Sequence, residues 1–131
     1  TDEVQSNEAF VQLSTGVDGV CAIDSADQIK CGGAGYAPTP PITTEIPSGN
    51  FSLVSVGRDV ACALEKPSGQ LFCWGPTNVV QYILEDMPED NFRAVSVGQA
   101  VACGLYADGA LRCWGDGDTH REDDIQQLGN P

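Results

Sequence analysis

The sequence predicts an all-β fold made of three stacked copies of one small antiparallel sheet. Three observations carry the prediction: a repeat of fixed period, an alternation of large and small residues, and one pair of cysteines around a turn in each copy. Phe10, Phe51 and Phe92 open equivalent stretches and follow one another at intervals of 41 residues. Periods of roughly 20–50 residues are typical of units that bury their apolar faces against their neighbours.

Each copy contains an opening stretch, a stretch of small residues and a return stretch. The second copy reads FSLVSVG at 51–57, VACAL at 60–64 and CWG at 73–75, and the third reads FRAVSVG at 92–98, VACGL at 101–105 and CWG at 113–115. The first copy is more divergent, with FVQLSTG at 10–16, VCAI at 20–23 and CGG at 31–33. We treat residues 1–131 as one repeat domain, with repeats at 9–49, 50–90 and 91–131.

The middle stretches have the pattern of strands that pack on both faces. In residues 101–105, Val, Cys and Leu alternate with the smaller Ala and Gly, which gives the two-residue period of a strand. Asp108 and Gly109 then form a strong hairpin signal. Later apolar stretches follow at 42–46, 79–84 and 125–128. Residues 81–85 could form one helical turn, but their β-branched and aromatic neighbours favour a strand. We therefore expect three or four strands per copy and no helix.

Two tryptophans, Trp74 and Trp114, follow the second cysteine of their copies. We expect them to fill the gaps between adjacent sheets, where Ala61, Ala102 and Gly104 are small enough to allow a close approach. The alternative is an exposed aromatic platform that binds a ligand.

The six cysteines form one pair in each copy: Cys21 with Cys31, Cys62 with Cys73, and Cys103 with Cys113. Six cysteines allow 15 pairings, but a turn lies between the members of each pair. If each pair flanks a hairpin, its Cα atoms lie about 4.5–5.5 Å apart on adjacent strands, within disulfide reach. Zinc sites favour cysteines two to four residues apart, which this sequence lacks. We expect three disulfides and an oxidising, extracellular compartment.

The formal net charge of −13 sets aside two classes of partner. The six Lys and Arg residues are scattered among 19 carboxylates, whereas nucleic-acid binding needs clustered cations. We therefore expect no nucleic acid and no anionic membrane as partners. No stretch approaches the roughly 20 apolar residues that span a bilayer, so we expect no membrane insertion in this segment.

The recurring pattern Phe-x-x-Val-Ser-x-Gly, Ala-Cys-Ala-Leu, Gly-x-Leu and Cys-Trp-Gly resembles the repeat of the regulator of chromosome condensation superfamily. The paired cysteines make it most similar to the extracellular crinkly type, found in plant receptor-kinase ectodomains and other surface proteins. The resemblance is weaker in the first copy, where Gly32 stands in place of the tryptophan. It implies a β-propeller with one blade per repeat. The nuclear exchange-factor and chromatin roles of that superfamily do not carry over, because the cysteines and the acidity contradict them.

Propellers close with four to eight blades, so three blades leave the ring open. Three arrangements remain: a segment of a longer propeller, an assembly completed by copies of itself or by partners, and an open repeat array. The chain ends at Pro131, where the strand before a fourth phenylalanine would begin. We therefore expect further repeats of the same polypeptide, or self-assembly, to complete it.

Few residues point to catalysis or cofactor binding. His120 is the only histidine, so no nucleophilic triad can be assembled, and we expect no enzymatic activity and no cofactor. The acidic run at 116–124 could hold calcium through Asp116, Asp118 and Asp123, although a solvated loop is the simpler interpretation. Asn50 begins an N-glycosylation motif, Asn-Phe-Ser.

Together these observations predict a non-catalytic, extracellular β-repeat scaffold that forms part of a surface assembly, a filament or a receptor ectodomain. The alternative is a secreted binding protein, an enzyme inhibitor or a lectin. Such proteins present solvent-facing aromatic residues, and the loops here offer only Tyr36, Tyr82 and Tyr106. The sequence therefore favours the scaffold.

Overall fold

The computed structural model describes residues 9–17, 19–33, 46–58, 60–75, 77–85, 87–98 and 101–115. Within these ranges the chain forms three antiparallel sheets of three strands each and one helix. Sheet A contains β1 (Phe10–Thr15), β2 (Gly19–Asp24) and β3 (Ile29–Gly33). Sheet B contains β4 (Phe51–Val56), β5 (Ala61–Glu65) and β6 (Leu71–Trp74), and is followed by α1 (Thr77–Glu85). Sheet C contains β7 (Ala94–Val97), β8 (Val101–Leu105) and β9 (Leu111–Gly115).

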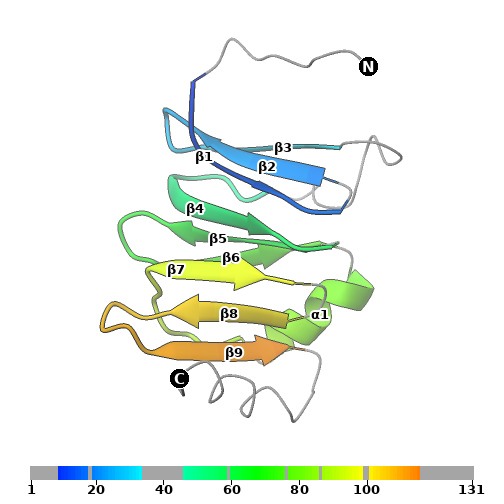
Figure 1. Cartoon of the computed structure of the whole chain (residues 1–131), viewed down its shortest axis with the longest axis vertical. Coiled ribbons are helices and arrows are strands. Elements are labelled where there is room, and N and C mark those ends of the chain that lie inside the picture. The colour runs from blue at the N-terminus through cyan, green and yellow to red at the C-terminus, as the bar shows by residue number, and fades with distance from the viewer. Residues whose placement is uncertain are drawn as a thin grey trace, which may run out of the picture.

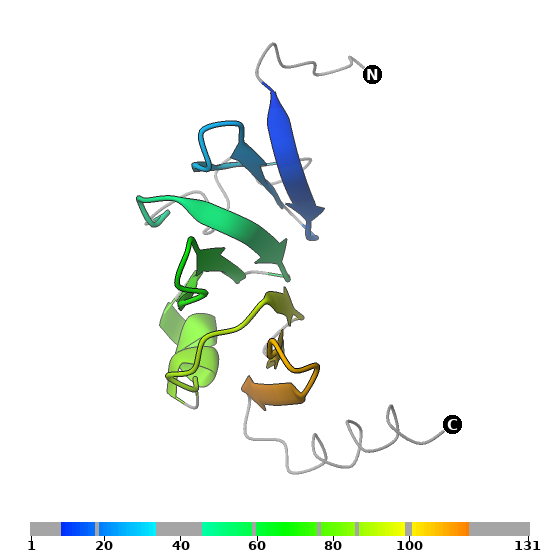
Figure 2. The same cartoon turned by 90° about the vertical axis from the view of Figure 1, so that its left-hand side faces the viewer.

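The three sheets lie one above another, with sheet A at one end of the stack and sheet C at the other (Figure 1). Each has its strands in sequence order, so neighbouring strands in the chain are neighbours in the sheet. The first strands of the three sheets, β1, β4 and β7, follow one another along one side of the stack (Figure 2). The stack does not close on itself. The predicted all-β fold of three propeller-type blades is confirmed.

The register places equivalent residues at equivalent points of each sheet. Cys21 lies opposite Cys31, Cys62 opposite Cys73, and Cys103 opposite Cys113. In each return strand, the residue after the second cysteine pairs with the residue before the first: Gly32 with Val20, Trp74 with Ala61, and Trp114 with Ala102. Positions 41 residues apart in the opening strands can therefore be compared directly.

Two apolar cores lie between the sheets, and the middle strand of sheet B contributes to both. Ala61 and Ala63 of β5 belong to the core shared with sheet A, whereas Cys62 and Leu64 belong to the core shared with sheet C. This division follows from the strand geometry, because successive side chains point to opposite faces. We call the contact of sheets A and B the A–B junction, and that of sheets B and C the B–C junction.

The prediction of a strand at 79–84 is wrong, because this segment lies within the helix α1. Val80 and Ile83, three residues apart, are both buried in the core of the B–C junction, while Leu84 is exposed. A helix with 3.6 residues per turn places positions three apart on one face. Strand propensity is weak enough for this packing to override it. The other expected late strands, at 42–46 and 125–128, lie largely or wholly outside the described residues.

Candidate interaction surface

Each blade is closed internally by one disulfide. The three bonds join Cys21 to Cys31, Cys62 to Cys73 and Cys103 to Cys113, with Cα atoms 4.1, 4.0 and 4.0 Å apart. Each bond links the second and third strands of one sheet and closes a loop of 10 or 11 residues. In the chain-entropy model such a loop stabilises its blade by about 2–3 kcal/mol. Every blade therefore carries its own covalent restraint.

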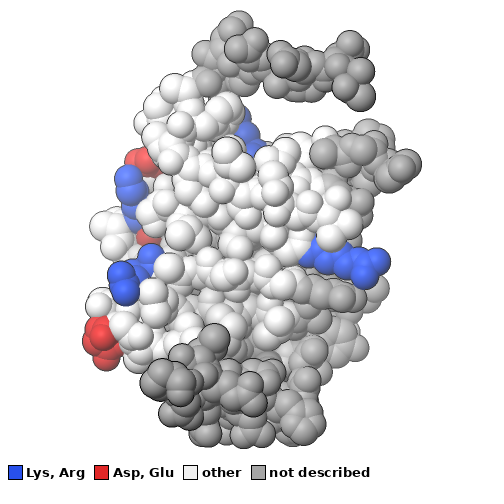
Figure 3. All heavy atoms as spheres, viewed as in Figure 1, with Lys and Arg blue, Asp and Glu red and all other residues white. Residues whose placement is uncertain are grey.

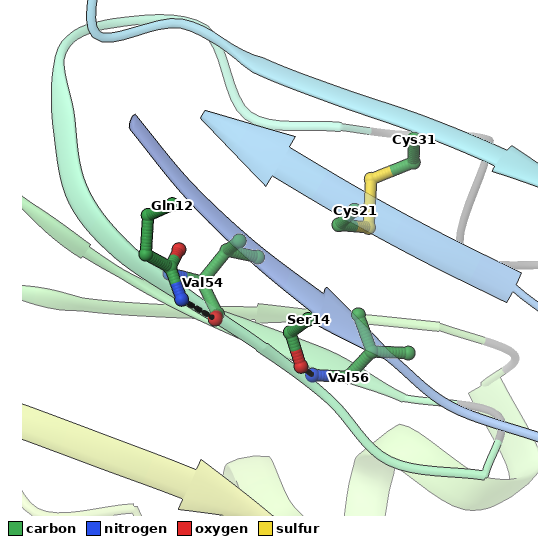
Figure 4. The surroundings of a disulfide bond; sticks show 6 residues. All are labelled: Gln12, Ser14, Cys21, Cys31, Val54 and Val56. Carbon is green, nitrogen blue, oxygen red and sulfur yellow. Dashed lines mark hydrogen bonds between the residues drawn. A yellow bond between two sulfur atoms is a disulfide. The ribbon is translucent and has the colours of Figure 1, made fainter. Parts of the chain in front are cut away.

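Polar side chains of one sheet bond to the backbone of the next. At the A–B junction, the side chain of Gln12 donates to the carbonyl of Val54 (3.0 Å) and accepts from its N–H (2.8 Å). The hydroxyl of Ser14 accepts from the N–H of Val56 at 3.0 Å. Figure 4 shows both side chains of β1 reaching across to β4, beside the Cys21–Cys31 bond. These bonds satisfy backbone groups of β4 that its own sheet leaves open.

The B–C junction reuses the serine position. Ser55 lies 41 residues after Ser14, and its hydroxyl accepts from the N–H of Val97 at 3.1 Å. The third member of this series, Ser96, is exposed and pairs with Cys103 in its own sheet, but its hydroxyl bonds to none of the described residues.

The hairpin turns between the second and third strands make a second recurring link. The carbonyl of Asp27 accepts from the N–H of Phe51 (2.7 Å), and that of Gly69 accepts from the N–H of Phe92 (3.0 Å). Asp27 and Gly69 both lie four residues before the second cysteine and both have positive φ, at 65° and 78°. Gly109 is their counterpart in sheet C, with φ 93°. The left-handed conformation lets the turn present its carbonyl to the following blade.

Two glycines, Gly16 and Gly57, allow the opening strands to approach at their ends, and Gly98 is their counterpart in sheet C. A Cβ at Gly16 would collide with the carbonyl of Gly57, and a Cβ at Gly57 would collide with the carbonyl of Gly98. At Gly98 the nearest atoms belong to Val101, at 3.4 and 3.7 Å, which is ordinary contact. Among the described residues, Gly98 thus has no neighbour of the kind that restricts Gly16 and Gly57.

Aromatic side chains fill the junctions from within. Trp114 stacks on Phe92 with ring centroids 5.5 Å apart, and both are buried in the B–C core. The ring of Phe92 occupies the space that a Cβ at Gly104 would need. Trp74 is buried in the A–B core. The two tryptophans therefore pack between sheets, as predicted, and do not form an exposed platform.

Crevices open where a hairpin meets the segment that leads into the next blade. One of about 320 Å³ lies between Gln28, Ile29 and the segment 46–49. Its counterpart of about 450 Å³ lies between Gln70, Leu71 and the segment 87–91. A third hollow of about 370 Å³ lies beside Trp74 and is lined by Phe72, Val80 and Leu84. These recesses are the concave parts of the described surface that could receive a partner's side chains.

Charged groups lie around the hairpins. The Oδ1 atom of Asp24 accepts from the N–H groups of Gln28 and Ala26, each at 2.9 Å. The bond from Gln28 is the main cause that lowers the pKa of Asp24 below its ordinary value; burial opposes it, and the bond from Ala26 and the charge of Lys30 (3.6 Å) add to it. Lys66 bridges to Asp27 at 3.3 Å across the A–B junction. Figure 3 shows charged side chains at the margins of the visible face, with an uncharged centre.

Only one of the remaining predicted site residues, Asn50, lies among the described residues. Asn50 is exposed immediately before β4, and its glycosylation stays a prediction. The calcium candidates Asp116, Asp118 and Asp123 lie outside the described residues. Within the described ranges, no three His, Cys, Asp or Glu side chains gather to hold a metal ion, and no helix is long and apolar enough to cross a membrane.

Tyr106, one of the three tyrosines of the chain, is held by a hydrogen bond: its hydroxyl donates to Asp90 at 2.7 Å.

Sequence reasoning did not identify the residues that link the blades. Gln12, the serines at 14 and 55, and the left-handed turn residues Asp27 and Gly69 act through backbone groups of the adjoining blade. The available signal was the recurrence of Ser-x-Gly at 14–16, 55–57 and 96–98. The spacing alone does not show whether these serines link neighbouring sheets or are simply part of a strand.

No family model and no curated protein matches this sequence. Solved structures do match. The ectodomain of the receptor kinase CR4 of Physcomitrella patens superposes with a TM-score of 0.66 and 25% identity, over 85% of this chain and 29% of that one. The CRINKLY WD40 ectodomain of the Arabidopsis thaliana receptor kinase ACR4 gives 0.64 and 21% identity, over 85% and 38%. Prp20p of Saccharomyces cerevisiae gives 0.60 and 17%, over 82% and 31%.

This chain therefore spans between 29% and 38% of the length of these solved proteins. The likeness is in the fold, a series of small antiparallel sheets. The fold is that of three adjacent β-propeller blades.

Proposed function

We propose that the chain is a non-catalytic, extracellular module of the crinkly repeat type, acting as a disulfide-closed scaffold in a surface assembly, a filament or a receptor ectodomain. The observation that carries the proposal is the presence of one disulfide inside every blade. Such bonds persist in oxidising compartments and are rare in the cytosol. The matched ectodomain of CR4, at 25% identity, belongs to a receptor kinase and supports the same setting.

The partner we propose is another protein. The solved structure of Prp20p is described with its binding to Gsp1p and histones, so a propeller of this architecture can bind proteins. In the present chain the crevices beside the hairpins and the hollow beside Trp74 are suitable recesses. Loops held by a rigid scaffold commonly carry binding residues.

A secreted binding protein of the inhibitor or lectin type is the second candidate, supported by the hollow lined by Phe72, Val80 and Leu84. Sugar binding of the lectin type relies on exposed aromatic rings. Both tryptophans are buried, and Tyr106 packs against Phe92 with ring centroids 4.8 Å apart. These observations favour the scaffold over the lectin.

The proposal is tested on intact cells that express the full-length gene product. A membrane-impermeant amine-reactive biotin reagent should label the protein before lysis, because half of the Lys66 side chain is exposed and its amine is held only by a surface ion pair with Asp27. Cross-linking on the same cells should then recover it in a protein complex. Labelling that occurs only after lysis would overturn the extracellular assignment, and a cell-surface protein never found in a complex would favour the secreted binder.

A further inference from the structure

Among the described residues, no other sheet packs on the outer face of sheet A, whereas sheet B packs against sheet A and sheet C packs against sheet B. Phe10 is 40% exposed, whereas its counterparts Phe51 and Phe92 are 0% and 4% exposed. Leu13 is 65% exposed, whereas its counterpart Val54 is 1% exposed because it packs against sheet A. The outer face of sheet A is therefore equivalent to the faces of sheets B and C that pack against the preceding sheet.

The outer face of sheet C is equivalent to the faces of sheets A and B that pack against the following sheet. Ser96 is exposed in the position where Ser14 and Ser55 bond to the next sheet. Gly98 has room where Gly16 and Gly57 meet a neighbouring carbonyl. The carbonyl of Gly109 receives no hydrogen bond from a described residue, whereas those of Asp27 and Gly69 do. On the same face, Leu105 is half-buried, although its counterpart Leu64 is fully buried.

We propose that the open face of sheet C binds the open face of sheet A on a second copy of the chain, head to tail. This proposal rests on the proposed scaffold function and identifies a second copy of the chain as the partner in the assembly. The chain forms this type of junction twice internally, so a second copy supplies a face of the same repeat type. Two copies would bring six blades together, within the four to eight of closed propellers.

The repeat specifies the contacts of this intermolecular junction. The hydroxyl of Ser96 accepts from the N–H of Thr15 on the second copy, as Ser14 and Ser55 accept from Val56 and Val97. The carbonyl of Gly109 accepts from the N–H of Phe10 on that copy, following Asp27 and Gly69. None of these four residues is charged, so these two hydrogen bonds bring no like charges together.

The long-range charge acts against association. Each copy carries a formal charge of −13, and the repulsion between copies is screened as salt increases. Association should therefore strengthen as salt is raised from low concentration to about 0.15 M.

The contact is heterologous, because two different faces meet, and this gives a decisive test. Leu13→Asp disables the sheet A face at a side chain that is largely exposed in the single chain. Gly98→Ala disables the sheet C face, because the added methyl would meet the carbonyl of Gly16 on the second copy, as a Cβ at Gly57 meets that of Gly98. Among the described residues of its own chain, this methyl meets only Val101. Leu84→Asp is the matched control: another exposed leucine, on α1 and outside both faces. Because Leu84 lines the hollow beside Trp74, this variant also separates association through the sheet faces from binding at that hollow. Circular dichroism melting of each variant checks that it remains folded.

Sedimentation velocity over a range of concentrations measures the assembly. We expect dimers of the wild-type chain and of Leu84→Asp, and at least about tenfold weaker association for Leu13→Asp and for Gly98→Ala alone. An equimolar mixture of these two variants should recover heterodimers, because each supplies the face that the other lacks. Gly32→Trp should tighten wild-type association roughly tenfold by restoring the tryptophan missing from the sheet A face.

Other outcomes overturn the proposal. A wild-type chain that stays monomeric at all concentrations has no such contact. Dimers that survive both substitutions use another surface, and dimers lost only in Leu13→Asp indicate two sheet A faces meeting each other. None of these results affects the surface labelling that tests the proposed function, so the two can fail separately.

Discussion

The A–B and B–C junctions both pack one sheet on the next, but different side chains make the contacts. At the A–B junction, Gln12 and Ser14 make three hydrogen bonds to the backbone of β4. At the B–C junction, the described opening strands keep one such side-chain bond, from Ser55, and the counterpart of Gln12 is Leu53, which packs against the apolar core. The B–C junction adds the helix α1 and the stacked pair of Phe92 and Trp114.

The difference shows which features the repeat requires. The glycine contact, the turn carbonyl and the serine bond occur at both junctions, so they define the geometry of approach. The position of Gln12 and Leu53 accepts either a polar or an apolar side chain, because a glutamine can bond to open backbone groups while a leucine gains from burial. We therefore expect the B–C junction to depend more on apolar packing and the A–B junction more on hydrogen bonds.

Removing an aromatic ring should have the largest effect. Phe92→Ala leaves a cavity beside Trp114 and Gly104, and we expect the free energy of unfolding to fall by about 3–5 kcal/mol. The matched change Phe10→Ala, at the exposed counterpart, should cost much less. Urea denaturation of both variants measures the difference. Equal losses would mean that the aromatic position acts within its own blade and not at the junction.

A methyl group at the glycine contact should have the next largest effect. Gly57→Ala collides with the carbonyl of Gly98 and forces the opening strands of sheets B and C apart. We expect a loss of about 1–3 kcal/mol. Gly98→Ala, which meets no such neighbour within the chain, is the control and should change stability little in dilute solution. Comparable stability of the two variants would contradict the close approach.

The sequence predicted the features that depend on local spacing. The 41-residue period gave three sheets, and the cysteines around each turn gave bonds within each blade, because hairpin partners lie close in the chain. The helix α1 was missed because Val80 and Ile83 are spaced for a helix but sit among β-branched and aromatic residues that favour strands. The links between blades were missed because Gln12 and Ser14 bond to backbone atoms that any sequence supplies.

Hydrogen bonds across the A–B junction should contribute less than the apolar contacts. Ser14→Ala leaves the N–H of Val56 without its partner, and we expect a loss of about 1 kcal/mol. Ser96→Ala removes the equivalent hydroxyl where no described residue bonds to it, and should be nearly neutral at concentrations too low for association. Thermal denaturation followed by circular dichroism compares the two. A neutral Ser14→Ala would show that the serine series is not a structural link.

Acid should weaken the first hairpin through Asp24. Because the pKa of Asp24 is lowered in the folded chain, its stabilising effect is complete above the unfolded value of about 4 and is lost as the pH falls through the folded pKa. Asp24→Asn should therefore reduce stability at pH 7 and flatten the dependence on pH below about 4. Stability curves of the two proteins between pH 2 and 7 test this; parallel curves would contradict the assignment.

The central claim is that each blade is closed by its own disulfide and that no disulfide joins one blade to another. Peptide mapping of the unreduced protein by mass spectrometry tests it most directly. The account predicts three disulfide-linked pairs, Cys21 with Cys31, Cys62 with Cys73, and Cys103 with Cys113, and no free thiol. A linkage between cysteines of different copies, or a free thiol in protein recovered from its native compartment, would contradict it.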